Sequence, residues 1–467
     1  MTYFNHLDKY AEQIALVDES GADQTYAAIL ADGDEIAAKI GRRCLVFLNC
    51  SNCFESVTAY LGCLRAGVVP VLLSTSLDPA LLNDLLDNYR PTFVFGPEAM
   101  FRGRDFREVF RFREYLLAAT GYEPDYGLHD DLALMLTTSG STGSPKLVRQ
   151  SYRNIQANTE SIIEYLGISL EDRAITTLPM HYTYGLSILN SHLASGARVI
   201  LTEASVTDRA FWKLLREEQA TTFGGVPYIY EMLKKLRFET METPSLRYLT
   251  QAGGRLDAVL LRELCDICED KGLRFIVMYG QTEATARMSW LPWERAREKS
   301  ESIGLAIPGG RFWLADEEIE PIKEPGMVGE LVYDGPNVTL GYAESRHDLA
   351  RGDERGGRLF TGDLAKCDEE GFYYIVGRKK RFLKLFGSRI NLDELENLLN
   401  REGYLCACTG SDDQLVIFFE GLDEQRAQVE LFLSERLKLN RGGFKVRLIQ
   451  AIPRNEAGKM LYAALPL

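Results

Sequence analysis

Strands and helices alternate in the N-terminal part of the chain, and this alternation restricts the fold more than any other feature of the sequence. Three short apolar runs are predicted strands, at residues 44–48, 68–73 and 92–95. Between them, residues 55–66 and 81–86 are predicted helices. Strands that alternate with helices are typical of parallel sheets. The sequence therefore predicts an α/β fold.

The size and charge of the chain limit its organisation and its partners. With 467 residues it is too long for one ordinary core, so we expect two or more domains. A net charge of −14 argues against nucleic acid or an anionic membrane as a general partner. The N-terminus lacks a signal-peptide pattern, and no apolar run approaches the roughly 18–20 residues that span a bilayer. We expect a cytoplasmic protein with no nucleic-acid partner and no membrane span.

Cysteine usage predicts reduced thiols, since nine cysteines are an odd number in a long chain. Two pairs have the C-x-x-C spacing that zinc sites use, Cys50/Cys53 and Cys265/Cys268. The second pair falls on a predicted helix over residues 256–271, where it joins an apolar stripe. Buried thiols are therefore the favoured interpretation, and a zinc site is the alternative.

Residues 101–115 contain five arginines among five aromatic residues. A face that docks nucleic acid or a carrier protein is one interpretation. However, residues 110–113 alternate with a period of two, as a half-buried strand does, and Glu108 and Glu114 dilute the positive charge. We favour the structural interpretation.

A loop rich in glycine and hydroxyl residues, L-T-T-S-G-S-T-G-S-P-K-L, spans residues 136–147. Glycine allows a close backbone approach to a ligand, and consecutive N–H groups can then bind an anion. The loop is not a Walker A motif, because Pro145 precedes the lysine and Leu147 follows it. It suits nucleotide phosphates, and a polar surface turn is the alternative. Its candidate binding residues are Thr138, Ser139, Gly140, Ser141, Thr142, Gly143 and Lys146.

Other candidate residues follow predicted strands. A strand at residues 275–278 runs into Y-G-Q-T-E, in which Tyr279 offers a flat face for a base and Thr282 a hydroxyl for a phosphate. Glu283 is the kind of hard oxygen ligand that Mg²⁺ prefers. In open α/β sheets ligands bind beyond the carboxyl ends of the strands. The further candidates in such positions are Gly280, Gln281, His181, Tyr182, Gly224 and Gly225.

Five motifs occur in an order that resembles the adenylate-forming superfamily, which contains acyl-CoA synthetases, adenylation domains of peptide synthetases, and luciferases. They are T-S-G-S-T-G-S-P-K, Y-G-Q-T-E, F-T-G-D-L, G-R-K-K and P-R-N-E-A-G-K. The resemblance implies a large N-terminal domain of several subdomains, with stacked α/β sheets and a small β-barrel, at residues 1–379. It also implies a small mobile α+β C-terminal domain at residues 380–467, with a hinge near Lys380.

The resemblance also implies the chemistry. A carboxylic acid would react with ATP and Mg²⁺ to give an acyl-adenylate and pyrophosphate. The acyl group would then pass to coenzyme A, or to the phosphopantetheine of an acyl or peptidyl carrier protein. The alternatives are an enzyme that loads an amino acid onto a carrier protein, and a luciferase-like oxidation of the adenylate. Residues 181–190 contain no acidic residue to pair with a substrate ammonium, which disfavours an amino acid.

Residue roles carry over from the family onto the matching positions. The glycine-rich loop would hold the β- and γ-phosphates, Thr282 would contact the α-phosphate, and Glu283 would bind Mg²⁺. Gly253, Gly254, Arg255 and Tyr279 would flank adenine, with Gly280 and Gln281 beside them. Asp363 and Arg378 would bind the ribose. Lys459 would bridge the substrate carboxylate and the α-phosphate, and Lys384 would serve the thioester-forming step. His181, Tyr182, Gly224 and Gly225 would line the acid pocket.

These roles predict opposite effects for the two C-terminal lysines. Lys459→Ala should abolish adenylation, because it removes the cation at the reacting carboxylate, and should leave transfer from a supplied acyl-adenylate largely intact. Lys384→Ala should leave adenylation largely intact and abolish transfer from a supplied acyl-adenylate. Pyrophosphate release and thioester formation are measured separately. Equal loss of both half-reactions in either variant would contradict the assignment.

Overall fold

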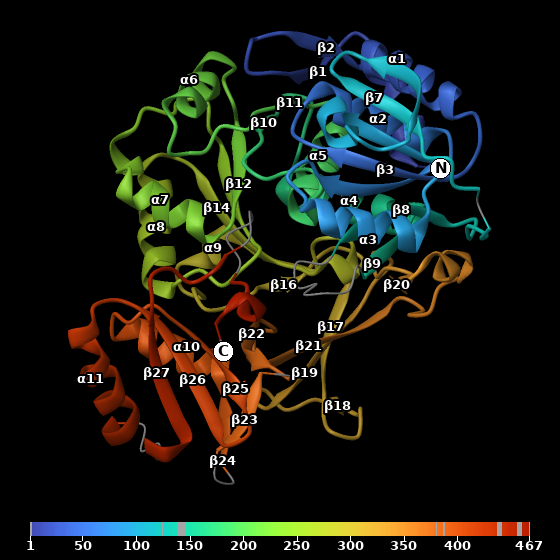
Figure 1. Ribbon diagram of the computed structural model, residues 1–467. Helices are drawn as coiled ribbons and strands as arrows, with labels where there is room; N and C mark the ends of the chain where they lie inside the picture. The colour runs from blue at the N-terminus through green and yellow to red at the C-terminus, as the bar shows by residue number, and fades with distance from the viewer. Residues whose placement is uncertain are drawn as a thin grey trace. The chain divides into compact units, whose positions relative to one another are not determined.

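The computed structural model describes residues 2–123, 125–137, 146–379, 381–385, 388–436, 441–454 and 460–466. The chain forms two compact units, Met1–Arg311 with Tyr333–Leu359, and Phe312–Val332 with Phe360–Leu467 (Figure 1). Lys380 lies outside the described residues, so the hinge and the domain boundary there stay predictions. In the described part of the chain, no helix is both long and apolar enough to cross a membrane.

A nine-stranded sheet in the first unit has a parallel centre, in which β1, β11, β10, β12, β13 and β14 are neighbours in that order. Its outer strands β2, β15 and β16 are antiparallel to their neighbours. The strands are β1 Ile14–Val17, β2 Asp23–Thr25, β10 Arg173–Ile175, β11 Arg198–Ile200, β12 Thr222–Gly225, β13 Tyr248–Gln251, β14 Arg274–Tyr279, β15 Ser289–Leu291 and β16 Leu305–Ala306.

An eight-stranded sheet of the same unit runs in the order β20, β9, β8, β4, β3, β5, β7, β6. Its centre is parallel, and antiparallel strands extend it on both sides. The strands are β3 Leu45–Cys50, β4 Val69–Ser74, β5 Phe93–Pro97, β6 Arg107–Phe112, β7 Tyr115–Ala119, β8 Leu132–Thr137, β9 Leu147–Ser151 and β20 Gly341–Ala343.

Helices cover these sheets: α8 packs on β14 and α7 on β12, while α4 and α5 pack against each other (Figure 1). Two large apolar clusters fill the spaces between helices and strands. The helices of the first unit are α1 Tyr26–Ile40, α2 Phe54–Arg65, α3 Pro79–Tyr89, α4 Tyr152–Leu166, α5 Thr183–Ala194, α6 Arg209–Glu217, α7 Pro227–Lys235, α8 Ala258–Asp270 and α9 Trp293–Ala296.

Three smaller sheets belong largely to the second unit. A five-stranded sheet has the order β18, β17, β19, β21, β22, and a pair and a three-stranded sheet follow it. Helix α10 packs against the three-stranded sheet over one apolar core. The elements are β17 Arg311–Ala315, β18 Pro321–Ile322, β19 Val328–Asp334, β21 Arg358–Cys367, β22 Tyr373–Arg378, β23 Phe382–Leu385, β24 Ser388–Asn391, α10 Leu392–Arg401, β25 Cys406–Ser411, β26 Gln414–Glu420, α11 Asp423–Leu431 and β27 Phe444–Ile449.

The predicted alternation of strands and helices is confirmed, because β3, α2, β4, α3 and β5 follow one another over residues 45–97. The structure also gives the arginine-rich segment as strand β6, in which Phe110 and Phe112 are half-buried. There Arg111 forms ion pairs with Glu98 and Glu108, so its positive charge is paired within the chain.

Six of the nine cysteines are buried, and Cys53, Cys265 and Cys367 are partly buried. All nine lie in the described part of the chain and are free. Asp257 caps α8 by accepting hydrogen bonds from the N–H groups of Val259 and Leu260. On this helix, burial raises the pKa of Cys265 and of Cys268 to about 12. Both therefore stay protonated at neutral pH, which favours packing over metal binding.

The charge of the basic run at residues 379–384 favours a linker, but residues 382–384 of this run belong to strand β23. Leu383 and Leu385 alternate along β23 and are buried in the core of the second unit. Arg381 lies just before the strand and pairs with Asp393 and Glu396. Charge density alone did not reveal the alternating leucines.

Helices α1 and α2 pack closely because each carries a glycine at the contact. A β-carbon on Gly62 would overlap the carbonyl group of Gly33 and lie 2.7 Å from its carbon. A β-carbon on Gly33 would lie 2.9 Å from the carbonyl oxygen of Thr58. These contacts are with backbone atoms, which cannot rotate away as a side chain does.

Gly62→Ala should therefore destabilise the first unit by about 3 kcal/mol, because the two helices have to move apart. Urea denaturation followed by circular dichroism measures the change. The control is Glu35→Ala at an exposed position of α1, which should change stability by less than about 0.5 kcal/mol. A Gly62→Ala protein as stable as this control would show that the helices are not held at this distance.

Candidate active site

Three neighbouring parallel strands end at one edge of the nine-stranded sheet, and predicted site residues follow each of them. Gly225 of β12 is in register with Gln251 of β13, which is in register with Val277 of β14. Residues 224–225, 251–255 and 279–283 are therefore brought together along this edge. Carboxyl ends of parallel strands are the usual place for a ligand in such sheets.

Glycines at this edge let other groups approach the backbone. Gly253 has φ +83°, and a β-carbon on it would lie 2.7 Å from the hydroxyl oxygen of Tyr182. A β-carbon on Gly224 would lie 2.8 Å from the hydroxyl oxygen of Tyr184. A β-carbon on Gly280 would overlap the carbonyl group of Ala286. The predicted roles of these glycines in ligand binding stay predictions, and their close packing is a sufficient reason for glycine.

The remaining predicted residues at this edge are partly buried. Gln281 donates a hydrogen bond to the hydroxyl of Tyr279 at 3.2 Å. Burial raises the pKa of Tyr182 to about 12, so it remains a neutral phenol. His181 immediately precedes it and is half-buried. Arg255 is more exposed and pairs with Glu301 at 3.3 Å.

The candidate metal ligand Glu283 is held from both ends. Its Oε1 accepts a hydrogen bond of 2.6 Å from the hydroxyl of Tyr342. Its backbone carbonyl accepts hydrogen bonds from the N–H and hydroxyl of Thr339, at 3.0 and 2.9 Å, and from Arg355 Nη1 at 2.9 Å. Burial, and then the charge of Glu283, raise the pKa of Tyr342, so the phenol stays a donor.

Tyr342 also joins the glycine-rich loop to this carboxylate. Lys146 Nζ lies 3.8 Å from the centre of the Tyr342 ring, and the Arg355 guanidinium carbon lies 4.7 Å from it. Such cation–π contacts fix the ring between two positive groups. Lys146 also lies 3.3 Å from Glu344. We call Lys146, Glu283, Tyr342 and Arg355 the charged cluster. Neither Tyr342 nor Arg355 was predicted from the sequence.

The chain turns sharply just after Glu283. Thr285 has φ 66° and ψ −62°, a conformation that β-branched residues rarely adopt. The N–H of Ala286 donates to the carbonyl of Ala284 at 2.8 Å and closes the turn. The hydroxyl of Thr285 donates to the carbonyl of Asn337 at 2.7 Å. The carbonyl of Thr285 accepts a hydrogen bond from Thr183. A strained turn of this kind persists only where the surrounding contacts determine it.

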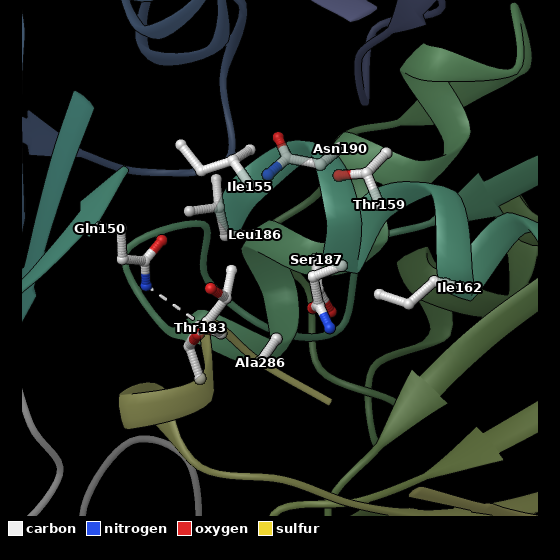
Figure 2. Close-up of a pocket in the computed structure, with 11 residues that line it drawn as sticks. Gln150, Ile155, Thr159, Ile162, Thr183, Leu186, Ser187, Asn190 and Ala286 are labelled. Atoms are coloured by element: carbon white, nitrogen blue, oxygen red, sulfur yellow. Dashed lines mark hydrogen bonds between the residues drawn. The ribbon is translucent and has the colours of Figure 1, made fainter. Parts of the chain in front are cut away.

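Figure 2 shows a small cavity beside this turn, lined by α4, α5 and the segment after Glu283. Its polar lining is neutral, and the dashed line marks the hydrogen bond from Gln150 to the carbonyl of Thr285. The residues that line it include Gln150, Asn158, Thr183, Leu186, Ser187, Asn190, Thr285 and Ala286. Thr183, Leu186, Ser187 and Asn190 belong to residues 181–190, the segment in which a partner for a substrate ammonium was sought from the sequence. The other four were not predicted.

In the second unit, Asp363 of β21 faces Arg378 of β22 across the hairpin. Their side chains form an ion pair at 3.2 Å, and Asp363 is buried. The Thr361 hydroxyl accepts a hydrogen bond from the N–H of Asp363 at 3.1 Å. The two predicted ribose ligands thus lie side by side. Lys384 is on strand β23.

Several predicted residues lie outside the described part of the chain. They are Lys380, Lys459 and, in the glycine-rich loop, Thr138, Ser139, Gly140, Ser141, Thr142 and Gly143. Their predicted roles stay predictions.

Comparison with known proteins identifies the family. Residues 3–343 match the model of the AMP-binding enzyme family. The chain belongs to this family. It is 25% identical to the medium-chain fatty-acid–CoA ligase of Escherichia coli K12, over 86% of this chain and 77% of that one. It is 27% identical to the 2-succinylbenzoate–CoA ligase of Bacillus subtilis 168, over 96% of this chain and 94% of that one.

Solved structures agree on the fold. The o-succinylbenzoate–CoA synthetase of Bacillus subtilis in complex with AMP aligns with a TM-score of 0.80 and 24% identity, covering 99% of this chain and 98% of that one. Its complex with an acyl-adenylate intermediate aligns with a TM-score of 0.79. The predicted superfamily, the predicted α/β fold class and the prediction of an AMP-forming acid–thiol ligase are confirmed. A further match is the same synthetase in complex with ATP and magnesium ion, with a TM-score of 0.78 and 23% identity.

Tyr342→Phe tests whether the phenol orients Glu283. Loss of the hydroxyl leaves one carboxylate oxygen without its donor, so the Mg²⁺ concentration for half-maximal activity should rise by about 10-fold. The control is Tyr122→Phe, which removes a tyrosine–carboxylate hydrogen bond to Asp87 at another place in the same unit. It should leave the magnesium dependence unchanged. Identical magnesium curves for both variants would contradict the role of Tyr342.

Proposed function

We propose that the protein uses ATP to convert a carboxylic acid into an acyl-adenylate and then transfers the acyl group to a pantetheine thiol. The observation that carries the proposal is the charged cluster at the strand edge, in a chain of the AMP-binding family. In the first step a carboxylate oxygen attacks the α-phosphorus and pyrophosphate leaves. In the second step a thiolate attacks the acyl carbon and AMP leaves with the bonding electron pair.

The chemistry explains why such a site needs positive charge. A carboxylate is a poor electrophile, because its leaving group would be oxide, and AMP provides a stable leaving group instead. The enzyme has to bring two anions together, which requires cations and hydrogen-bond donors near the phosphates. Lys146 and Arg355 supply cations in the described part of the first unit, and Lys459 is the proposed cation at the reacting carboxylate.

Magnesium fits the donors present. Glu283 offers a carboxylate whose Oε1 is oriented by Tyr342, and carboxylate oxygens are ligands that Mg²⁺ prefers. When bound there, Mg²⁺ would neutralise phosphate charge. The other proposed roles follow the family positions: Thr282 contacts the α-phosphate, the glycine-rich loop holds the outer phosphates, and Asp363 with Arg378 binds the ribose. Lys384 serves the thioester-forming step.

The acceptor and the place of action are part of the proposal. The relatives named above are CoA ligases, which supports coenzyme A, and a carrier protein's phosphopantetheine offers the same thiol. A cytoplasmic location is proposed from the sequence. An amino-acid substrate is disfavoured, because the α5 side chains that line the cavity in Figure 2 carry no negative charge to pair with an ammonium group. Oxidation of the adenylate remains the second alternative.

A panel of carboxylic acids tests the proposal by acid-dependent pyrophosphate release, repeated with coenzyme A and with a pantetheinylated carrier protein. Glu283→Gln should lower pyrophosphate release at least about 100-fold, because the amide loses the charge that binds the metal. The control is Glu263→Gln, which removes a surface partner of Lys234 and should leave the rate unchanged. Absence of pyrophosphate release with every acid in the panel would contradict the proposal.

A further inference from the structure

A buried arginine, Arg287, directly follows Ala286, which lines the cavity, and is 2% exposed. Its Nε donates to the hydroxyl of Ser187 at 3.1 Å. Its Nη1 lies 3.2 Å from the hydroxyl of Tyr165 and 2.9 Å from Met278 Sδ. The guanidinium carbon lies 4.9 Å from the centre of the Tyr184 ring. All of these contacts are with neutral groups.

The missing counter-ion distinguishes Arg287 from the other deeply buried arginine of this unit. Arg149 pairs with the carboxylate of Glu354 and donates to several carbonyls. For Arg287, no carboxylate among the described residues lies within ion-pair distance. A buried charge without a partner is costly, and its removal from water is repaid only by an opposite charge with good hydrogen bonds. An anion from outside the chain would repay this cost.

The guanidinium is fixed in place and retains donor capacity. Asn158 and Asn337 both donate to the carbonyl of Arg287, at 2.8 and 3.1 Å, and so anchor its backbone. The described contacts engage Nε and Nη1, and within the described chain none involves Nη2. The two N–H groups of Nη2 therefore have no acceptor among the described residues, and a charge-assisted hydrogen bond to a carboxylate would supply one.

The position of Arg287 links it to the acid rather than to the nucleotide. Ser187 and Ala286, its neighbours in space and in sequence, both line the cavity of Figure 2. Tyr184, over whose ring it lies, contacts Gly224 at the predicted acid pocket. Met278 belongs to β14, which ends at Tyr279 and is followed by Glu283 of the charged cluster.

We infer that Arg287 is a specificity-determining residue that binds a second carboxylate of the substrate, so that the enzyme activates short dicarboxylic acids. The inference rests on the proposed function, since it concerns the acid that is adenylated. One carboxylate reacts with ATP, and the other pairs with Arg287 inside the pocket. A monocarboxylic acid of the same length leaves the guanidinium buried without an anion and is therefore a poor substrate.

Matched pairs of acids test this inference: succinate with butyrate, glutarate with valerate, and phthalate with benzoate. The wild-type enzyme should prefer the dicarboxylic acid of at least one pair by about 100-fold in kcat/KM for pyrophosphate release. Arg287→Met retains most of the side-chain volume and removes the charge. It should lose about 100-fold on that dicarboxylic acid, mainly through KM, and should not lose activity on the matched monocarboxylic acid.

Two further variants separate the charge from the fold. Arg287→Lys keeps the charge without the planar fork and should recover part of the preference. Arg274→Met removes an arginine that packs on Tyr248 at the other end of β14 and should leave the preference unchanged.

A wild-type preference for the monocarboxylic acid in every pair would overturn the inference while leaving the proposed function intact. Equal losses on both acids of a pair in Arg287→Met would also overturn it. If no acid releases pyrophosphate, the proposed function fails, and the inference with it.

Discussion

The candidate site depends on how the segment after β14 is held in a conformation that it would not adopt alone. Thr285 takes a positive φ there, at a cost of about 1–3 kcal/mol. Hydrogen bonds from Gln150, Thr183 and Asn337 to groups on or beside this residue offset that cost. The contacts come from β9, from α5 and from the segment before β20, so three separate parts of the first unit fix the turn. Because the turn directly follows Glu283, the same contacts set the direction in which its carboxylate points.

The sequence predicted the site residues that are consecutive in the chain, but it did not predict contacts between residues far apart in the chain. Tyr279 to Glu283 are consecutive, so their chemistry and their place after a strand could be recognised together. The partners that orient Glu283 are far along the chain: Tyr342 is 59 residues away and Arg355 is 72. The tertiary fold brings them together, and no spacing in the sequence encodes these contacts. The same limit explains β23, where the buried Leu383 lies within a basic run and the buried Leu385 directly follows that run.

The charges of the residues at the proposed acid pocket disfavour an amino acid as the substrate. Helix α5 carries no acidic residue, so it offers no partner for a substrate ammonium group. The structure adds a positive group at the same place, since Arg287 donates to Ser187 of α5 and lies over the ring of Tyr184. A substrate ammonium would be repelled there, whereas a carboxylate would be attracted at short range in a medium of low dielectric constant. Both observations disfavour an amino acid as the substrate of the proposed pocket.

Within the second unit, one buried ion pair joins the two segments that carry the predicted lysines. Arg381, just before β23 and Lys384, donates to Glu396 of α10 at 2.7 Å. Tyr462, shortly after Lys459, donates to the other oxygen of Glu396 at 3.0 Å, and its ring centre lies 3.7 Å from the Arg381 guanidinium. Burial raises the pKa of Glu396, and the charge of Arg381 opposes that shift. Arg381 and Tyr462 are therefore both anchored on α10, which ties the start of β23 to residues 460–466.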